Sequence, residues 1–138
     1  MKDIERIAGS IYQMQRKIRA KLSNELSQGE ITIPQHHILY CLLDKGEATM
    51  SEVADYLFVS PPAVTGLVDK LVKINLVKRS FSSSDRRIII ISLTKKGKAV
   101  ISKIKSQFES LLLSILKEFS PEEKKSFLEV TEKMEKLL

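Results

Sequence analysis

Apolar residues recur at intervals of three or four along most of the 138-residue chain, and this spacing predicts a mainly helical protein. The first stripe predicts a helix with one narrow apolar face, formed by Ile4, Ile7, Ile11, Met14, Ile18 and Leu22. A face this narrow needs a partner helix to cover it. Similar stripes predict five further helices, which begin near Thr32, Thr49, Ser60, Thr94 and Ser120.

Capping signals mark where several of these helices begin and end. Thr32 with Gln35, and Thr49 with Glu52, have the spacing of capping boxes, in which two side chains satisfy backbone amides at a helix start. Gly46 offers a stop between these two helices. The last helix has comparable start signals in Ser120, Pro121 and Glu123.

The segment from 77 to 93 departs from helical spacing and predicts a single β-hairpin. VKRSF (77–81) and RIIIISL (87–93) have strand propensity, and the residues from Ser82 to Asp85 supply the turn. Side chains alternate faces along a strand, so we expect Asp85 and Arg87 to pair on one side. A helix-turn-helix followed by a basic-tipped hairpin is a winged helix.

The helix that begins at Ser60 has the pattern of a recognition helix. Pro61 and Pro62 are tolerated in its first turn, where amide hydrogens have no helical acceptor, and Ser60 is expected to cap it. Its outward positions are polar or small: Thr65, Gly66, Asp69, Lys70 and Lys73. This face suits approach to base edges in a DNA groove. An ordinary amphipathic surface helix remains the alternative.

The positive charge of the chain is concentrated around these elements. Between Lys70 and Lys105 there are 11 Lys or Arg residues against one acidic residue, whereas the rest of the chain has 12 basic and 16 acidic residues. A local basic segment predicts a polyanionic partner. Arginine suits the minor groove of DNA, so the wing arginines are candidates for it; a solvated charged turn is the alternative.

Other functional classes find little support in the sequence. There is no Gly-rich phosphate loop, Gly-x-Ser-x-Gly or HExxH motif, so we expect neither an enzyme nor a cofactor. No apolar run reaches 18 residues and the N-terminus has no leader-like apolar segment, which predicts a cytoplasmic protein without membrane contact. Cys41 is the single cysteine, so no disulfide or thiolate zinc site is expected.

Three segments resemble the winged helix of the multiple antibiotic resistance regulator (MarR) family: TIPQHHILYCLL, MSEVADYLFVSPPAVTGLVDKLVKINLVKR and SDRRIIIISLTKKG. Asp85-x-Arg87 in the wing and Leu93-Thr94-x-x-Gly97 after it match the pattern of that family. The resemblance implies a homodimeric transcriptional regulator, more often a repressor, that binds a palindromic operator in double-stranded DNA. It also implies release by a small molecule or an oxidant.

The resemblance assigns DNA contacts to individual positions. Major-groove contacts to bases or phosphates fall on Ser60, Pro62, Thr65 and Lys70, and Lys73 extends this face. The wing is expected to place Arg87, steadied by Asp85, in the minor groove and Arg86 on a phosphate. Asn75 stands where the family commonly has glycine. Gly66 is expected to permit close approach of the helix backbone to DNA; a functionally neutral position is the alternative.

The chain is expected to comprise an N-terminal dimerisation helix (1–30), a winged helix-turn-helix lobe (31–97) and C-terminal dimerisation helices (98–138). The last two helices have apolar stripes, formed by Ile101, Ile104, Phe108, Leu111, Ile115, Phe127, Thr131, Met134 and Leu138. Together with the first helix they suit an intertwined dimer. The alternative to the dimer is an intramolecular three-helix bundle. The alternative to DNA binding is a winged helix that binds another protein.

A candidate effector pocket lies where the dimer helices are expected to meet the DNA-binding lobe. The resemblance places an aromatic or phenolic effector there, beside Tyr12, His36, His37, Tyr40 and Cys41. Adjacent histidines on a helix diverge by about 100°, so we expect no metal site at His36 and His37. Cys41 is expected in the core; an oxidant-sensing role for this thiol is the alternative.

Overall fold

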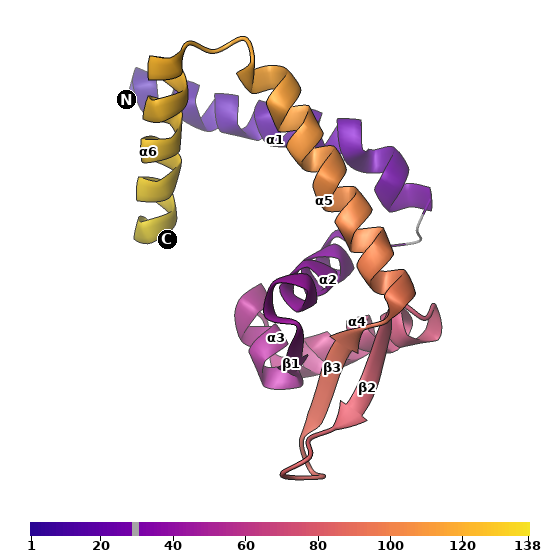
Figure 1. Ribbon diagram of the computed structural model, residues 1–138. Helices are drawn as coiled ribbons and strands as arrows, with labels where there is room; N and C mark the ends of the chain where they lie inside the picture. Colours follow the sequence, from indigo (N-terminus) through magenta and orange to yellow (C-terminus); the bar gives the residue numbers. More distant parts are fainter. Residues whose placement is uncertain (29–30) are drawn as a thin grey trace. The chain divides into compact units, whose positions relative to one another are not determined.

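The computed structural model describes residues 1–28 and 31–138 (Figure 1). In this part of the chain the helices are α1 (Lys2–Gln28), α2 (Ile33–Lys45), α3 (Met50–Leu57), α4 (Pro61–Lys73), α5 (Lys95–Leu116) and α6 (Pro121–Leu137). The strands are β1 (Glu47–Thr49), β2 (Val77–Phe81) and β3 (Ile89–Leu93). These elements confirm the expected fold class, mainly α with a small β wing. The chain divides into two compact units, 1–104 and 105–138.

The predicted capping boxes form at the starts of α2 and α3. The Gln35 side chain accepts from the Thr32 amide at 2.9 Å, and the Thr32 hydroxyl accepts from the Gln35 amide at 3.3 Å. Thr49 and Glu52 make the same reciprocal pair at 3.3 and 3.1 Å. These bonds satisfy amides that a helix start leaves without partners, which is why the sequence marks the two starts so clearly.

The three strands form one antiparallel sheet in the order β1-β3-β2. β2 pairs with β3 from Val77 opposite Leu93 to Phe81 opposite Ile89. β1 pairs on the other side of β3, with Ala48 opposite Ile91. β1 is not predicted from the sequence, because three residues are too few to show strand alternation and their pairing depends on a distant segment.

The wing loop is longer than predicted. The second strand was expected to begin at Arg87 but begins at Ile89. Inside the loop the Ile88 amide donates to the Asp85 carbonyl at 3.1 Å, and the Ser82 amide donates to the Ile88 carbonyl at 2.9 Å. In the register of the two strands Ser82 stands opposite Ile88, so the second bond continues the ladder. The Ile88 amide, however, is diverted to Asp85 within the turn, and both wing arginines therefore belong to the loop.

A single apolar core joins α2, α3, α4, the sheet and the start of α5. Its largest fully buried apolar side chains are Ile38, Leu39, Leu42, Val53, Val64, Val68, Leu71, Val77, Ile91 and Ile101. Cys41 is fully buried in the same cluster. The helix-turn-helix and the wing are therefore packed around one core, and the position of each is fixed by the other.

The segment after α4 is tied to the start of α5 by backbone contacts. Asn75 has a φ of 63°, the left-handed conformation expected where the family commonly has glycine. The Thr94 hydroxyl donates to the Asn75 carbonyl at 2.6 Å, and the Thr94 amide donates to the Leu76 carbonyl at 3.1 Å. The same hydroxyl accepts from the Gly97 amide at 2.9 Å and so caps α5, as predicted.

Apolar side chains of α1 and α6 lie on the surface of the chain. The exposed large apolar residues include Ile4, Ile7, Met14, Phe127, Leu128, Val130 and Met134. The capping box of α6 is present, with the Glu123 amide donating to the Ser120 hydroxyl at 3.1 Å. Residue 30, where the first proposed segment ends, lies outside the described ranges, so the proposed division stays a prediction. No described helix is long and apolar enough to cross a membrane.

Candidate nucleic-acid interface

One face of α4 is polar and exposed, as the sequence predicts. Val64, Val68 and Leu71 are buried on its inner side. The outer side exposes all of the helix positions expected to contact DNA: Pro62, Thr65, Gly66, Lys70 and Lys73. Because the inner side is packed in the core, this outer face is held at the surface of the lobe in one orientation.

Ser60 marks the start of α4, but its hydroxyl makes no capping hydrogen bond. Ser60 is the N-cap residue, but the expected side-chain cap does not form, because Pro62 has no amide hydrogen and the Ala63 amide has another acceptor. The Ala63 amide donates to the Ser60 backbone carbonyl at 3.1 Å instead. The hydroxyl therefore remains at the surface, beside the exposed N-terminal end of the helix.

Gly66 leaves the middle of this exposed face flat. A Cβ built on Gly66 would meet nothing within 4 Å, so no neighbour in the described structure requires glycine there. The φ of Gly66 is also not positive. Packing within the described structure thus gives no reason for glycine at this position.

The wing loop presents Arg87 on a rigid support. The Arg87 guanidinium donates from Nε to Asp85 Oδ1 at 3.1 Å and from Nη2 to Asp85 Oδ2 at 3.0 Å. The Arg87 amide also donates to Asp85 Oδ1 at 2.9 Å. The predicted pair therefore forms, but within a turn and not through strand alternation. Arg87 is nevertheless 91% exposed, so its remaining donors face solvent.

These hydrogen bonds shift the titration of both partners. They lower the pKa of the Asp85 carboxyl, mainly through the Arg87 side chain and then through the Arg87 amide. The same pair raises the pKa of the Arg87 guanidinium. Asp85 is therefore ionised and Arg87 charged at neutral pH.

Arg86 lies beside Arg87 and borders a surface hollow of about 590 Å³ that Phe81, Ser82 and Ser83 also line. Hydroxyl groups and a guanidinium around one hollow are the donors that a phosphate accepts from. The arrangement agrees with the phosphate contact expected for Arg86, which stays a prediction.

Asp69 and Arg79 form an ion pair that the sequence analysis missed. Asp69 lies on the outer face of α4, and Arg79 lies on β2. The pair links the recognition helix directly to the wing. A sequence signal existed, because Asp69 is the only acidic residue between Ser60 and Lys73, on a face expected to approach a polyanion.

The residues expected around an effector are only partly brought together. On α2 the His36 ring lies 5.6 Å from the His37 ring and 6.3 Å from the Tyr40 ring. Burial, and then the neighbouring His37, lower the pKa of His36. Tyr12 is 64% exposed on α1, whereas Cys41 lies in the core, where burial raises the pKa of its thiol. No metal-binding cluster of three or more His, Cys, Asp or Glu occurs among the described residues.

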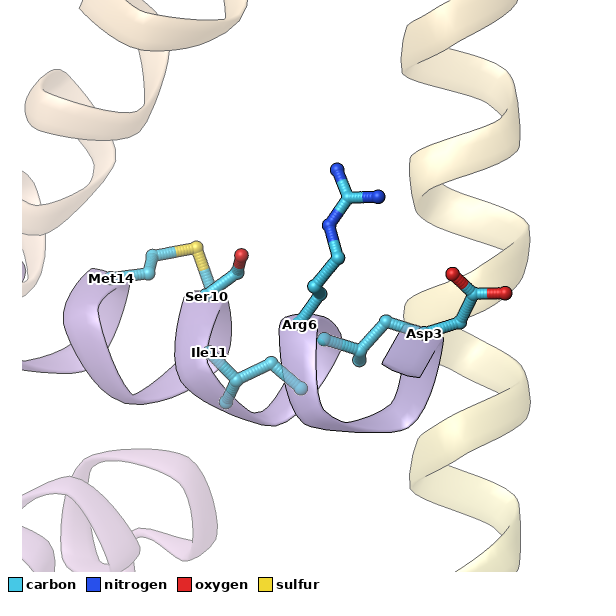
Figure 2. Close-up of a pocket in the computed structure, with 6 residues that line it drawn as sticks. Asp3, Arg6, Ser10, Ile11 and Met14 are labelled. Atoms are coloured by element: carbon cyan, nitrogen blue, oxygen red, sulfur yellow. The ribbon is translucent and has the colours of Figure 1, made fainter. Parts of the chain in front are cut away.

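A hollow of about 510 Å³ lies along α1 (Figure 2). Its lining follows one side of the helix and consists of Asp3, Arg6, Ile7, Ser10, Ile11 and Met14. Three of these residues belong to the apolar stripe that the sequence assigned to helix packing. The mixture of apolar and charged side chains suits a neighbouring helix with polar edges.

Comparison with known sequences gives consistent matches. A model of the MarR family matches residues 31–89, from α2 to the start of β3. The transcriptional repressor MdtR of Bacillus subtilis is 28% identical over 97% of this chain and 84% of its own length. The transcriptional regulator YsmB of the same organism is 30% identical over 88% of this chain and 79% of its own length.

Solved structures have a similar fold. YusO from Bacillus subtilis superposes with a TM-score of 0.76 at 26% identity, over 99% of this chain and 97% of its own. MepR of S. aureus in complex with DNA has a TM-score of 0.68 at 22% identity, over 93% and 98%. NadR in complex with 4-hydroxyphenylacetate has a TM-score of 0.76 at 22% identity, over 95% and 91%.

Proposed function

The chain belongs to the MarR family of DNA-binding transcriptional regulators, and from this we propose that it is a homodimeric repressor released from a palindromic operator by an effector. One observation supports this most strongly. The exposed face of α4 and the arginine-tipped wing are parts of one packed lobe. Such a lobe can place a helix in the major groove and an arginine in the adjacent minor groove.

We assign the contacts by their chemistry. Ser60, Thr65 and Lys70 offer donors to bases or phosphates of the major groove, with Pro62 at its rim and Lys73 toward the backbone. Gly66 lets the helix lie close to the DNA. In the minor groove Arg87, which Asp85 holds, contacts the bases, and Arg86 contacts a phosphate. Contacts to bases would determine sequence specificity, whereas contacts to phosphates would add affinity for any DNA. Each contact can be tested individually.

The dimer is proposed from the surfaces that the single chain leaves uncovered. α1 exposes Ile4, Ile7 and Met14, and α6 exposes Leu128 and Val130. Contiguous apolar helix faces are unfavourable in water, and a second copy of the chain would cover them. Two-fold symmetry would then set the recognition helices roughly 34 Å apart, which matches one turn of DNA and requires an inverted repeat.

The effector is proposed to be a small aromatic or phenolic compound that contacts His36, His37 and Tyr40, and Tyr12 and Cys41 remain candidates for the same site. The rings on α2 provide aromatic surface and hydrogen-bonding groups, and a neighbour of the same fold, NadR, is known with 4-hydroxyphenylacetate. Binding would shift the dimer to a spacing that no longer fits the operator. The buried thiol of Cys41 favours this mechanism over oxidant sensing.

Repression is supported by the relative MdtR, which is described as a repressor. We further propose that the protein acts in the cytoplasm, because its proposed partner is DNA. The relatives are regulators and not enzymes, so we propose no catalytic activity and no cofactor.

The test is a titration of the purified protein against DNA upstream of its own gene, at two salt concentrations and with excess random competitor. A repressor that neutralises about 6 to 10 phosphates will bind despite competitor and lose affinity steeply as salt rises. Candidate operators would also be selected from fragments of the whole genome. If random competitor DNA abolished binding to every one of them, the proposal would be overturned and a protein partner would be favoured.

A further inference from the structure

Phe58 is an aromatic residue at a backbone position that favours glycine. It follows α3 with a φ of 55° and a ψ of 42°, in the left-handed region. The Phe58 amide donates to the Asp55 carbonyl at 3.2 Å, and the Val59 amide donates to the Ala54 carbonyl at 3.1 Å. These two bonds make a Schellman motif, whose left-handed residue is usually glycine. A side chain there has a steric cost that glycine avoids.

The fold gains little from this side chain. Phe58 is 95% exposed and is not part of the apolar core. A phenylalanine that strains the backbone and buries almost nothing does not stabilise the free protein. A strained residue of this kind points to a role outside the fold, in contact with a partner.

The location of Phe58 identifies that partner. It lies in the turn between α3 and α4, two residues before Ser60. The N-terminal end of a recognition helix is the part that enters the major groove, so the preceding turn lies at the rim of that groove. Phe58 is thus continuous with the surface to which the DNA contacts of α4 are assigned.

We propose that Phe58 is a further DNA-contacting residue, whose ring packs against operator DNA at the rim of the major groove, on a thymine methyl or a backbone sugar. The inference rests on the proposed operator binding. The two hydrogen bonds of the Schellman motif fix the backbone that bears the ring, so little ordering is needed on binding. An apolar contact there adds affinity without neutralising a phosphate.

The experiment compares the full-length protein with Phe58→Gly, Phe58→Asn and Phe58→Tyr. Glycine and asparagine tolerate the left-handed backbone but lack the ring, whereas tyrosine keeps it. Phe58→Gly is expected to raise Tm by roughly 2 to 6 °C. Both ring-less variants are expected to bind operator roughly tenfold more weakly, because buried aromatic area is lost. The slope of log affinity against log salt is expected to stay unchanged, and Phe58→Tyr to bind as the parent does.

Wild-type affinity in both ring-less variants would overturn this inference while leaving operator binding by the parent intact. The inference would also be overturned if a ring-less variant lost operator affinity only where its Tm was lowered, because that loss would come from a less stable fold. Unchanged affinity with altered sedimentation of the free protein would assign Phe58 to a contact between protein copies instead. Failure of the parent to bind any operator would overturn the proposed function as well.

Discussion

Gly97 lies directly against the backbone of Leu76. A Cβ built on Gly97 would stand 1.9 Å from the Leu76 carbonyl oxygen and 2.8 Å from its carbonyl carbon. That carbonyl also accepts from the Thr94 amide, so it has little freedom to move. The start of α5 can therefore approach the segment after α4 only because residue 97 has no side chain.

Gly97→Ala is accordingly expected to destabilise the protein, although alanine is the better helix former. Displacing backbone in a packed lobe costs about 2 kcal/mol or more. The measurement is the free energy of unfolding by chemical denaturation. Gly9→Ala is the matched control, because a Cβ at Gly9 of α1 meets nothing within 4 Å; it should stabilise by about 0.5 to 1 kcal/mol. Equal effects of both substitutions would contradict the steric account.

Arg87→Ala is expected to lower operator affinity roughly tenfold or more and to leave dimerisation intact, because Arg87 is exposed at the wing and far along the chain from α1 and α6. Fluorescence anisotropy with labelled operator measures the affinity, and sedimentation measures the assembly. A variant that binds normally would remove the wing arginine from the mechanism.

Asp85→Asn is the milder change at the same site, since Arg87 keeps its charge but loses the carboxylate that holds it. A smaller loss of affinity than for Arg87→Ala is expected. The pKa of Asp85 is lowered, so the pair is complete at neutral pH and is lost only as pH falls below the ordinary range for aspartate. The carboxyl titration followed by NMR checks this; a midpoint at or above the ordinary value would contradict the pairing.

Lys70→Ala is expected to weaken all DNA sequences nearly equally. Lys70 is exposed near the end of α4, where a lysine acts on phosphates as a point charge. The slope of log affinity against log salt should fall by about one unit for each protomer contact that is lost. A loss confined to the operator, with random DNA bound as before, would show instead that Lys70 recognises bases.

Gly66→Ala separates a structural role from a DNA-binding one. The added methyl group has open space, so it should stabilise α4 by about 0.5 to 1 kcal/mol. It should nevertheless weaken operator binding if the helix backbone lies close to DNA. Unchanged affinity together with higher stability would refute the close approach.

The sequence predicted the features that depend on near neighbours. The capping boxes at Thr32 and Thr49, and the polar face of α4, follow from spacing within one helix, and the structure confirms them. The left-handed Asn75 was predictable from residue type. The individual DNA contacts remain predictions, because a contact depends on a partner that a sequence does not contain.

Features that depend on distant or competing groups were missed. The pairing of β1 with β3 joins segments about 40 residues apart, and the Asp69–Arg79 pair joins a helix to a strand. The Ser60 side chain makes no cap because the Ala63 amide donates to the Ser60 carbonyl instead, and β3 starts late because the Ile88 amide donates to the Asp85 carbonyl. In these last two cases a specific hydrogen-bonding partner overrode the local preference of the sequence.

β1 stands between α2 and α3 in the chain and pairs with the inner strand of the wing. The segment between α2 and α3 is thus hydrogen-bonded to the wing, which we propose to reach the minor groove. If the proposed DNA contacts are correct, the base of the wing cannot move away from this segment without breaking the ladder. We therefore expect the helix and the wing of one lobe to engage and leave DNA together.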